Sequence, residues 1–505
     1  MNGAGFVDPV KWNYYVETPV PLPAFVVRPP LPSVLAAIPL LLGGDVATIS
    51  GAHAALLGVF AAGVVLLARR MMSLTASVLC ALVLTLSPAA LSLSRVPLAD
   101  IPALLVLLLV LGSARGVVAS KSAAGLCAIA TIAGWATRPN LGAVGLAVVV
   151  VAIAELGPRR TLGSTPLRTY VGALFGGLAA IHFLVRSATG HAPYAGYGFM
   201  YETRLAMEAA SYSHEYVGMA TFLAGNAHTV LAQMRNNLVG LFEVLFLQPT
   251  FLRVGWIALP GIFYCVARDG RGRFERRLSA LAAIGFTLIV VVTWGTFDRL
   301  RYPLPIVLCG ALCGAALLDD LVASLLQRVP ARSRQLAAFA AAGIALAALL
   351  PRALDVASAR LAKGAEIVSA QARKQSIRKR DEGTVDPAVV DFCASLPPDA
   401  VVASGDPWSV HFACGNPAIL LPLGLKGAPA TRARFLETEA PRFILADLGR
   451  SARWVHRAGF RLVARNGDVS LYEVTDSRAK APSWSAPPPL LCAGREPDCR
   501  VALGR

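Results

Sequence analysis

The sequence predicts a polytopic α-helical membrane protein followed by a small α/β domain. The chain of 505 residues is 55% hydrophobic and only 15% charged, which is less charge than soluble proteins of this length carry. Apolar runs of helical length recur through roughly the first 350 residues, as expected for a helical membrane bundle. The remaining residues are mixed, turn-rich and amphipathic, as in a separate globular domain.

We expect about ten spanning helices, because each needs close to 20 mostly apolar residues. The candidate spans are 46–68, 72–90, 98–115, 122–137, 140–155, 168–186, 250–268, 279–295, 302–319 and 334–351. The run at 33–43, SVLAAIPLLLG, is too short to span. We expect it to lie in the membrane interface or to pack against the bundle.

Orientation follows from the basic residues, which gather in alternate connections such as RDGRGRFERR at 268–277. The positive-inside rule places these connections in the cytoplasm. The predicted divisions are an extracytoplasmic first loop with an interfacial helix (1–45), a bundle with a large external loop at 187–249 (46–352), an extracytoplasmic α/β domain (353–476) and a Pro-rich tail (477–505). The first residues lack a signal sequence. Either the first loop translocates unaided or a first helix precedes this sequence, and we favour the second alternative.

The net charge of +17 does not indicate nucleic-acid binding, because the excess lies in short loops and no basic face carries interleaved aromatic residues. Five cysteines lie in or beside apolar runs, where we expect small buried hydrophobic residues: Cys80, Cys127, Cys265, Cys309 and Cys313. The other four belong to the C-terminal part and allow three disulfide connectivities: Cys393, Cys414, Cys492 and Cys499.

The C-terminal domain contains short apolar runs bounded by turn residues, with helical stretches between several of them. The strand candidates are 400–404, 418–422, 442–446, 461–465 and 469–474. This alternation is typical of a small α/β layered domain.

Charged residues cluster near helix ends on the predicted outer face. They are Asp8, Arg28, Arg95, Asp100, Arg138, Asp298, Arg299 and Arg301. Arginine forks suit a phosphate-bearing substrate, and an aspartate can take a proton from a hydroxyl. Structural alternatives stay open: Asp8 before Pro9 is also a turn signal, and Arg95 with Asp100 could be a structural ion pair.

Five segments in order carry a family resemblance: GAGFVDPVKWNYY, RPPLPSVLAAIPLLLGGD, LSPAALSLSRVPLADIPALL, TRPN and DRLRYPLPIVL. Together they resemble the GT-C superfamily of integral-membrane glycosyltransferases, in the branch related to bacterial protein O-mannosyltransferases and lipid A aminoarabinose transferases. The resemblance covers residues 3 to 320, and it rests on the order of the segments more than on any one of them.

The resemblance implies roles for individual residues. Asp8 matches the acidic residue of the first external loop that acts as catalytic base, and Asp100 matches a second acidic residue on the acceptor or metal side. Donor-phosphate contacts fall on Arg95, Arg138, Arg301, Tyr302 and Arg28. The loop at 187–249 is rich in aromatic and charged residues. Aromatic rings in such a loop stack on sugars, or alternatively form an aromatic belt at the membrane interface. Its acceptor contacts are assigned to Tyr201, Glu202 and His191.

These expectations define a glycosyltransferase of the bacterial cytoplasmic membrane that uses a polyprenyl-phosphate sugar and a glycan, lipid or protein acceptor. The predicted site residues do not require a cofactor. They are compatible with a divalent metal ion, but two carboxylates are too few ligands to predict a metal site. The alternative is a transporter or flippase of a lipid-linked glycan. That class favours charges near the bilayer midplane and repeated halves, and the sequence has little sign of either.

Overall fold

The structure is a computed structural model of the chain, and two compact units divide it. One unit comprises Met1–Arg28, His182–Val230 and Val368–Arg505, and the other comprises Pro29–Ile181 and Leu231–Ile367. The residues that the structure describes are 7–8, 10–11, 22–23, 30–43, 46–94, 99–161, 163–189, 193, 221, 224–269, 272–293, 301–325, 387–404, 410–411, 414–421, 435–437, 440–447, 455, 460–466 and 469–474.

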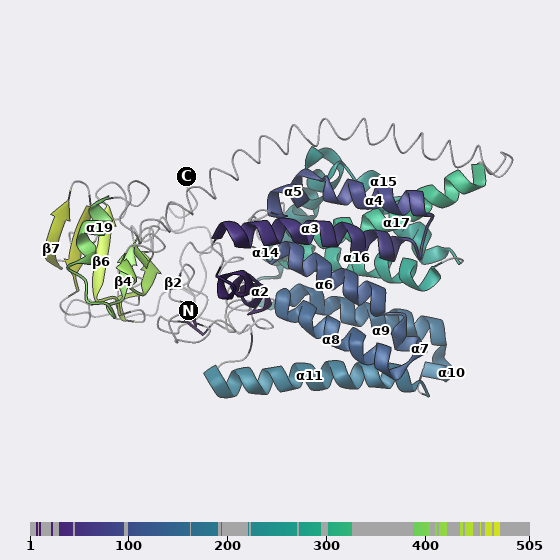
Figure 1. The fold of residues 1–505 in the computed structure, drawn as a ribbon, viewed down its shortest axis with the longest axis horizontal. Helices are drawn as coiled ribbons and strands as arrows, with labels where there is room; N and C mark the ends of the chain where they lie inside the picture. Colours follow the sequence, from purple (N-terminus) through teal and green to yellow (C-terminus); the bar gives the residue numbers. More distant parts are fainter. Residues whose placement is uncertain are drawn as a thin grey trace. The chain divides into compact units, whose positions relative to one another are not determined.

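The larger unit is a bundle of helices (Figure 1). The helices are α2 (Pro30–Leu41), α3 (Val46–Ala68), α4 (Leu74–Thr85), α5 (Pro88–Ser94), α6 (Asp100–Ser113), α7 (Gly116–Ala119), α8 (Lys121–Thr137), α9 (Gly142–Leu156), α10 (Pro158–Thr161), α11 (Thr165–Thr189), α14 (Ala227–Phe242), α15 (Gly255–Ala267), α16 (Arg273–Thr293) and α17 (Leu304–Leu325). Short helical turns follow α8 and α14: η1 (Pro139–Leu141), η3 (Glu243–Leu247) and η4 (Pro249–Phe251).

The helices confirm a polytopic helical membrane protein, although the count of about ten spans is not confirmed. A helix lies in every predicted span except 334–351, which is outside the described residues. By length and apolar composition, six helical stretches of the described residues can cross a membrane: Gly51–Ala68, Asp100–Ala119, Pro139–Leu156, Thr165–Ser187, Ala227–Leu247 and Leu304–Leu325. The predicted interfacial run is the short helix α2.

The predicted external loop at 187–249 differs from the structure, because its last third is helical. Helix α14 and the π-helical turn η3 continue from Ala227 to Leu247. Polar residues such as Gln233 and Asn237 interrupt the apolar pattern there, which is why the sequence did not predict a span. The Asn237 amide donates to the carbonyl of Val291 at 2.8 Å, so one of these polar groups binds α14 to α16.

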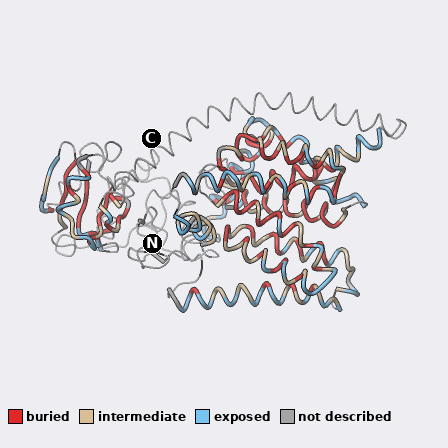
Figure 2. Tube along the Cα trace, viewed as in Figure 1, coloured by how far each residue is buried: buried red, intermediate tan, exposed pale blue. Residues whose placement is uncertain are grey.

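Burial follows the helix faces, as Figure 2 shows: inner faces of the bundle are buried and outer faces are exposed. The closest approach joins α15 and α17. A Cβ added at Gly261 would lie 2.4 Å from the backbone nitrogen of Gly314, and one added at Gly314 would lie 2.9 Å from the carbonyl oxygen of Ile257. Small residues at a helix interface let backbones approach in this way, and such contacts drive helix association in lipid.

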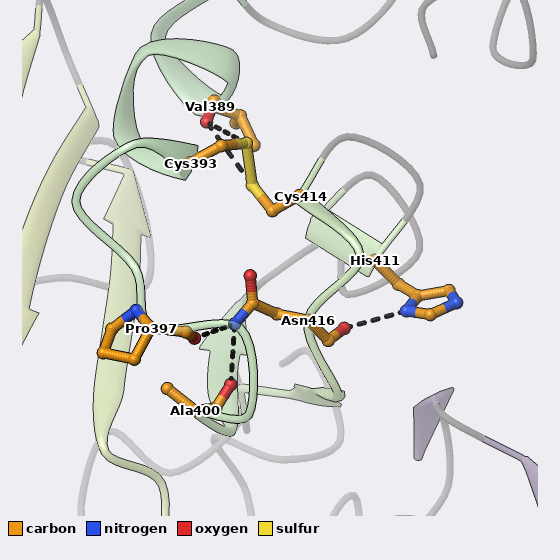
Figure 3. The surroundings of a disulfide bond; sticks show 7 residues. All are labelled: Val389, Cys393, Pro397, Ala400, His411, Cys414 and Asn416. Atoms are coloured by element: carbon orange, nitrogen blue, oxygen red, sulfur yellow. Dashed lines mark hydrogen bonds between the residues drawn. A yellow bond between two sulfur atoms is a disulfide. The ribbon is translucent and has the colours of Figure 1, made fainter. Parts of the chain in front are cut away.

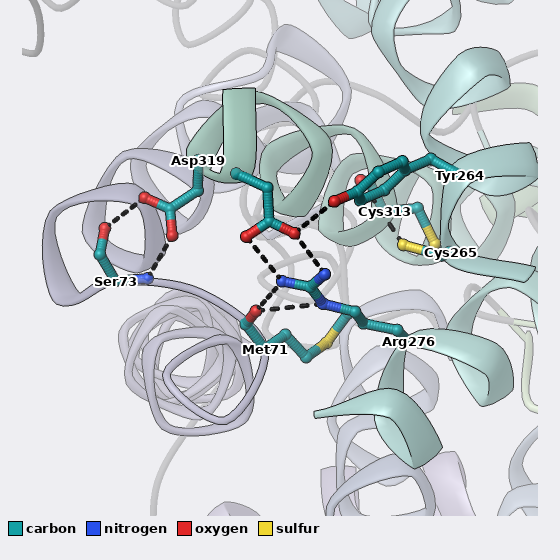
Figure 4. Close-up of polar contacts among 8 residues, drawn as sticks. Met71, Ser73, Tyr264, Cys265, Arg276, Cys313 and Asp319 are labelled. Atoms are coloured by element: carbon teal, nitrogen blue, oxygen red, sulfur yellow. Dashed lines mark hydrogen bonds and ion pairs between the residues drawn. The ribbon is translucent and has the colours of Figure 1, made fainter. Parts of the chain in front are cut away.

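A buried arginine connects three helices and one turn near the end of α17 (Figure 4). Arg276 of α16 is 3% exposed and forms a two-pronged ion pair with Asp320 of α17, with distances of 2.5 and 3.2 Å. The same guanidinium donates to the carbonyl of Met71, and the Tyr264 hydroxyl of α15 donates to Asp320 at 2.6 Å. The sequence placed Arg276 in a solvated basic loop, whereas the structure buries it.

The carboxylate of Asp319, the residue before Asp320, holds the start of α4 in place. Asp319 accepts hydrogen bonds from the backbone N–H of Ser73 at 2.7 Å and from its hydroxyl at 2.6 Å. The Ser73 hydroxyl in turn accepts from the N–H of Ala76 and caps α4. The two adjacent acids of α17 therefore have different partners: Asp319 binds the start of α4, and Asp320 binds Arg276 of α16.

The smaller unit contains a six-stranded mixed sheet with the order β2-β5-β4-β6-β8-β7. Its strands are β2 (Val10–Lys11), β4 (Val402–Ser404), β5 (Ala418–Leu420), β6 (Phe443–Asp447), β7 (Arg461–Asn466) and β8 (Val469–Glu473). Strands β2, β5, β4 and β6 are parallel, and β8 is antiparallel to β6 and β7. All five strands predicted in the C-terminal domain are confirmed, and β2 comes from the first loop.

Alternation along the strands produces a core on each face of the sheet. Val402 packs with Phe392 of the short helix α19 (Pro387–Cys393), whereas the next residue, Ala403, packs on the other face with Phe435 and Ile444. A second, two-stranded sheet pairs β1 (Val7–Asp8) with β3 (Leu22–Pro23) in antiparallel orientation.

The cysteines divide as the sequence predicts. The five cysteines of the apolar runs are buried and free. Among the connectivities left open, the structure forms Cys393–Cys414 (Figure 3); Cys492 and Cys499 lie outside the described residues.

Removing the Asp320 carboxylate with Asp320→Ala is expected to lower the free energy of unfolding by about 2 kcal/mol, because Arg276 is then buried without its carboxylate. Chemical unfolding in detergent, followed by tryptophan fluorescence, measures the change. The control is Asp269→Ala, whose carboxylate is 69% exposed beside Arg273 and Arg277; its expected effect is below roughly 0.5 kcal/mol. Equal effects of the two substitutions would contradict a special role for the buried pair.

Candidate functional site

The candidate site centres on a buried carboxylate at the start of α6. Asp100 is the first residue of the helix and is 1% exposed. A carboxylate at a helix N-terminus is stabilised by the helix dipole. That effect is too small to compensate a buried charge alone, so Asp100 requires cationic partners.

Arg138 supplies the first cation from the end of α8. It is the C-cap residue and is extended, as expected of a residue before proline, here Pro139. Its Nη2 lies 2.8 Å from the Oδ1 of Asp100, and its Nη1 donates to the carbonyl of Arg301 at 3.3 Å. Arg138 is itself 8% exposed.

Arg301 supplies the second cation from the turn before α17. Its Nε donates to the Oδ2 of Asp100 at 2.8 Å, and its side chain is 30% exposed. The next residue, Tyr302, presents its ring to Arg138, with the guanidinium carbon 5.6 Å from the ring centroid. Such a cation–π contact helps to hold a desolvated guanidinium in place.

The cluster of Asp100, Arg138, Arg301 and Tyr302, called here the arginine cluster, has two consequences for chemistry. In these ion pairs two guanidinium groups face one carboxylate, and Arg301 is the more exposed of the two arginines. An anion such as a phosphate is therefore attracted to this cluster. A metal cation beside Asp100 would be repelled by both arginines.

The same geometry limits what Asp100 can do. Both of its oxygens form ion pairs, so a guanidinium competes for each position at which a proton could be accepted. Within the described part of the chain, Oδ1 has its ion-pair partner but accepts no hydrogen bond of good geometry. Asp100 thus suits positioning of the two arginines better than it suits a general base.

The structure brings together only some of the predicted residues. Asp100, Arg138, Arg301 and Tyr302 meet, whereas the predicted partner Arg95 lies outside the described residues, as do Arg28, His191, Tyr201 and Glu202. Asp8 lies in strand β1 and belongs to the other compact unit.

The sequence reasoning missed the Arg276–Asp320 pair. A signal was present, because two adjacent acids inside the apolar run at 302–325 require buried partners. Across the residues that the structure describes, no group of three His, Cys, Asp or Glu side chains could hold a metal ion.

Comparison with known proteins gives a structural likeness and no sequence match. No family model matches the chain, and no curated protein matches its sequence. Among the solved structures that resemble it is the crystal structure of ArnT from Cupriavidus metallidurans bound to undecaprenyl phosphate. The two chains are 15% identical with a TM-score of 0.52, and the match covers 88% of this chain and 87% of ArnT. The chain therefore shares the overall fold of that membrane protein.

Coupling within the arginine cluster can be measured by a double-mutant cycle of Asp100→Asn and Arg301→Gln. We expect a coupling free energy of about 1–3 kcal/mol in unfolding measurements in detergent, because the two side chains are in direct contact. The comparison cycle pairs Asp100→Asn with Arg273→Gln, and additivity within roughly 0.5 kcal/mol is expected for these distant residues. Additive effects in the first cycle would show that the ion pair does not form.

Proposed function

We propose that this chain is a membrane glycosyltransferase that takes a sugar from a polyprenyl-phosphate donor and transfers it outside the cytoplasmic membrane. The observation that carries the proposal is the arginine cluster, in which a buried aspartate holds two arginines at helix ends. The fold shared with ArnT, a protein solved with undecaprenyl phosphate, supports the same donor class.

The reaction is a substitution at the anomeric carbon of the donor sugar. An acceptor hydroxyl attacks this carbon, a new carbon–oxygen bond forms, and the bond from the carbon to the phosphate oxygen breaks. The hydroxyl proton passes to a carboxylate base, and polyprenyl phosphate leaves with the bonding electron pair. The resemblance assigns the base to Asp8, and inversion at the anomeric carbon is expected for a single displacement.

The arginines act on the charge that develops on the leaving phosphate. The guanidinium of Arg301, the more exposed of the two arginines, contacts the phosphate. Arg138 holds the backbone of Arg301 through its carbonyl oxygen, and the ring of Tyr302 lies against the Arg138 guanidinium. Donors already held in place for such a charge lower the barrier, because they need no reorganisation during the reaction. The acceptor is a glycan, lipid or protein of the cell envelope, and the domain after the bundle lies on the same extracytoplasmic side.

The test is transfer of radiolabelled sugar from a panel of polyprenyl-phosphate sugars into membranes of cells that express the chain. With the active donor, Arg301→Gln is expected to lower kcat by about 10²- to 10³-fold, as for loss of one oxyanion-stabilising donor. Asp8→Asn is expected to abolish transfer, and Asp8→Glu to retain part of it, because a carboxylate base is preserved.

Asp269→Asn at matched expression is the control and should transfer sugar at the native rate. No transfer above the empty vector with any donor, including after extension of the gene upstream, would overturn the proposal. A transport assay for lipid-linked glycan would then be the next experiment.

A further inference from the structure

We propose that the C-terminal sheet positions Asp8, because the first external segment is a structural part of that sheet. The inference rests on the proposed function for the role of Asp8 and goes beyond it in giving the C-terminal domain a task. The domain acts as the holder of the proposed base, and it does so through a strand contributed from the beginning of the chain.

The strand pairing is specific in register. Strand β2 pairs parallel with β5, with Val10 opposite Ala418 and Lys11 opposite Ile419. Asp8 is two positions before Val10, so its Cα lies within about 7 Å of the Cα of Val10. Any movement of β5 is therefore transmitted to Asp8 through a very short stretch of chain.

Asp8 is also held from its other side. In β1, Asp8 lies opposite Leu22 and Val7 lies opposite Pro23 in the two-stranded sheet. The proposed base thus sits between two pairings, one with β3 of the same segment and one with the C-terminal sheet. A carboxylate that must act at one geometry benefits from such constraint, since small displacements lower catalytic rates strongly.

Strand β5 is a firm support for this pairing. Ala418 and Ile419 are fully buried, and β4 pairs with the other edge of β5 in parallel orientation. Without β2, the strand β5 would be the outer strand of the sheet and would present unpaired backbone groups. The first segment therefore completes the sheet at the same time as the sheet fixes the segment.

The approach to β5 is fixed as well (Figure 3). The disulfide joins Cys414 to Cys393 of α19 four positions before β5 begins. Asn416, which is 1% exposed, donates to the carbonyls of Pro397 and Ala400 at 2.6 and 3.1 Å. The Nδ1 of His411 lies 2.8 Å from the carbonyl oxygen of Asn416. Position and register of β5, and with them those of β2, are determined by these contacts.

A disulfide-trapping experiment on the full chain in membranes tests the pairing without reference to activity. Paired Cα atoms of neighbouring strands lie about 4.8 Å apart, within the 4.4–6.8 Å range that a disulfide needs. Val10→Cys with Ala418→Cys should therefore crosslink, as peptide mapping by mass spectrometry under non-reducing conditions will show. Val10→Cys with Leu421→Cys is the matched control, since Leu421 is roughly 10 Å further along the strand and should not crosslink.

Two insertions test positioning of Asp8. Two glycines inserted after Pro9 separate Asp8 from β2 and should lower kcat at least tenfold while the KM for the donor stays unchanged. The same two glycines inserted after Trp12 lengthen only the chain between β2 and β3 and should leave kcat within about twofold. If the insertions acted only by disturbing the structure of the segment, both would lower kcat to the same extent.

The outcomes separate this inference from the proposed function. Failure of the in-register pair to crosslink, equal crosslinking of the control pair, or equal effects of the two insertions would overturn positioning by the sheet. Specific crosslinking combined with full activity of Asp8→Asn would show that the pairing exists and that the proposed function assigns the wrong base. Specific crosslinking with loss of activity only for the insertion after Pro9 is the expected result.

Discussion

The Asp100 carboxylate, buried between Arg138 and Arg301, is the interaction on which the candidate site depends. Its partners come from the end of α8 and the turn before α17, so one side chain joins three helix ends. A buried carboxylate without these cations would cost several kcal/mol. The arginines likewise need the carboxylate, because two guanidinium groups repel each other. The cluster is stable only as a whole.

Helix α17 connects this cluster to a second one. The arginine cluster borders its first residue, Leu304, and Asp319 and Asp320 lie roughly 22 Å further along the helix. Almost every residue between them, from Leu304 to Ala316, is buried and apolar. The ion pairs and side-chain hydrogen bonds of the acids and arginines at α17 thus lie at two levels, roughly 22 Å apart. Such spacing leaves the buried middle of the helix without a charge.

The sequence predicted the class of fold and most elements, because their signals are local. Apolar runs located the helices, and short apolar runs bounded by turn residues located all five C-terminal strands. Asp100, Arg138 and Arg301 were assigned to one face, but their contacts with one another were not predicted. These residues are distant along the chain and meet only through helix packing. Strand β2 could not be predicted either, because two residues have no periodicity and their partner lies in another part of the chain. The four cysteines of the C-terminal part allow three disulfide connectivities, and the sequence alone cannot select among them. Their proximity in the fold is what decides the pairing.

The pairing of β2 with β5 has a consequence for biosynthesis. Val10 leaves the ribosome about 400 residues before its partner Ala418. At typical elongation rates of 5–20 residues per second, the first segment waits roughly 20–80 s for β5 to exist. During this interval every described helix of the bundle is made and can insert, while the segment that carries Asp8 has no sheet to join. The pairing of β2 with β5 therefore forms only after these helices have been made, and a chain truncated before β5 retains all its described bundle helices but lacks the sheet that receives β2.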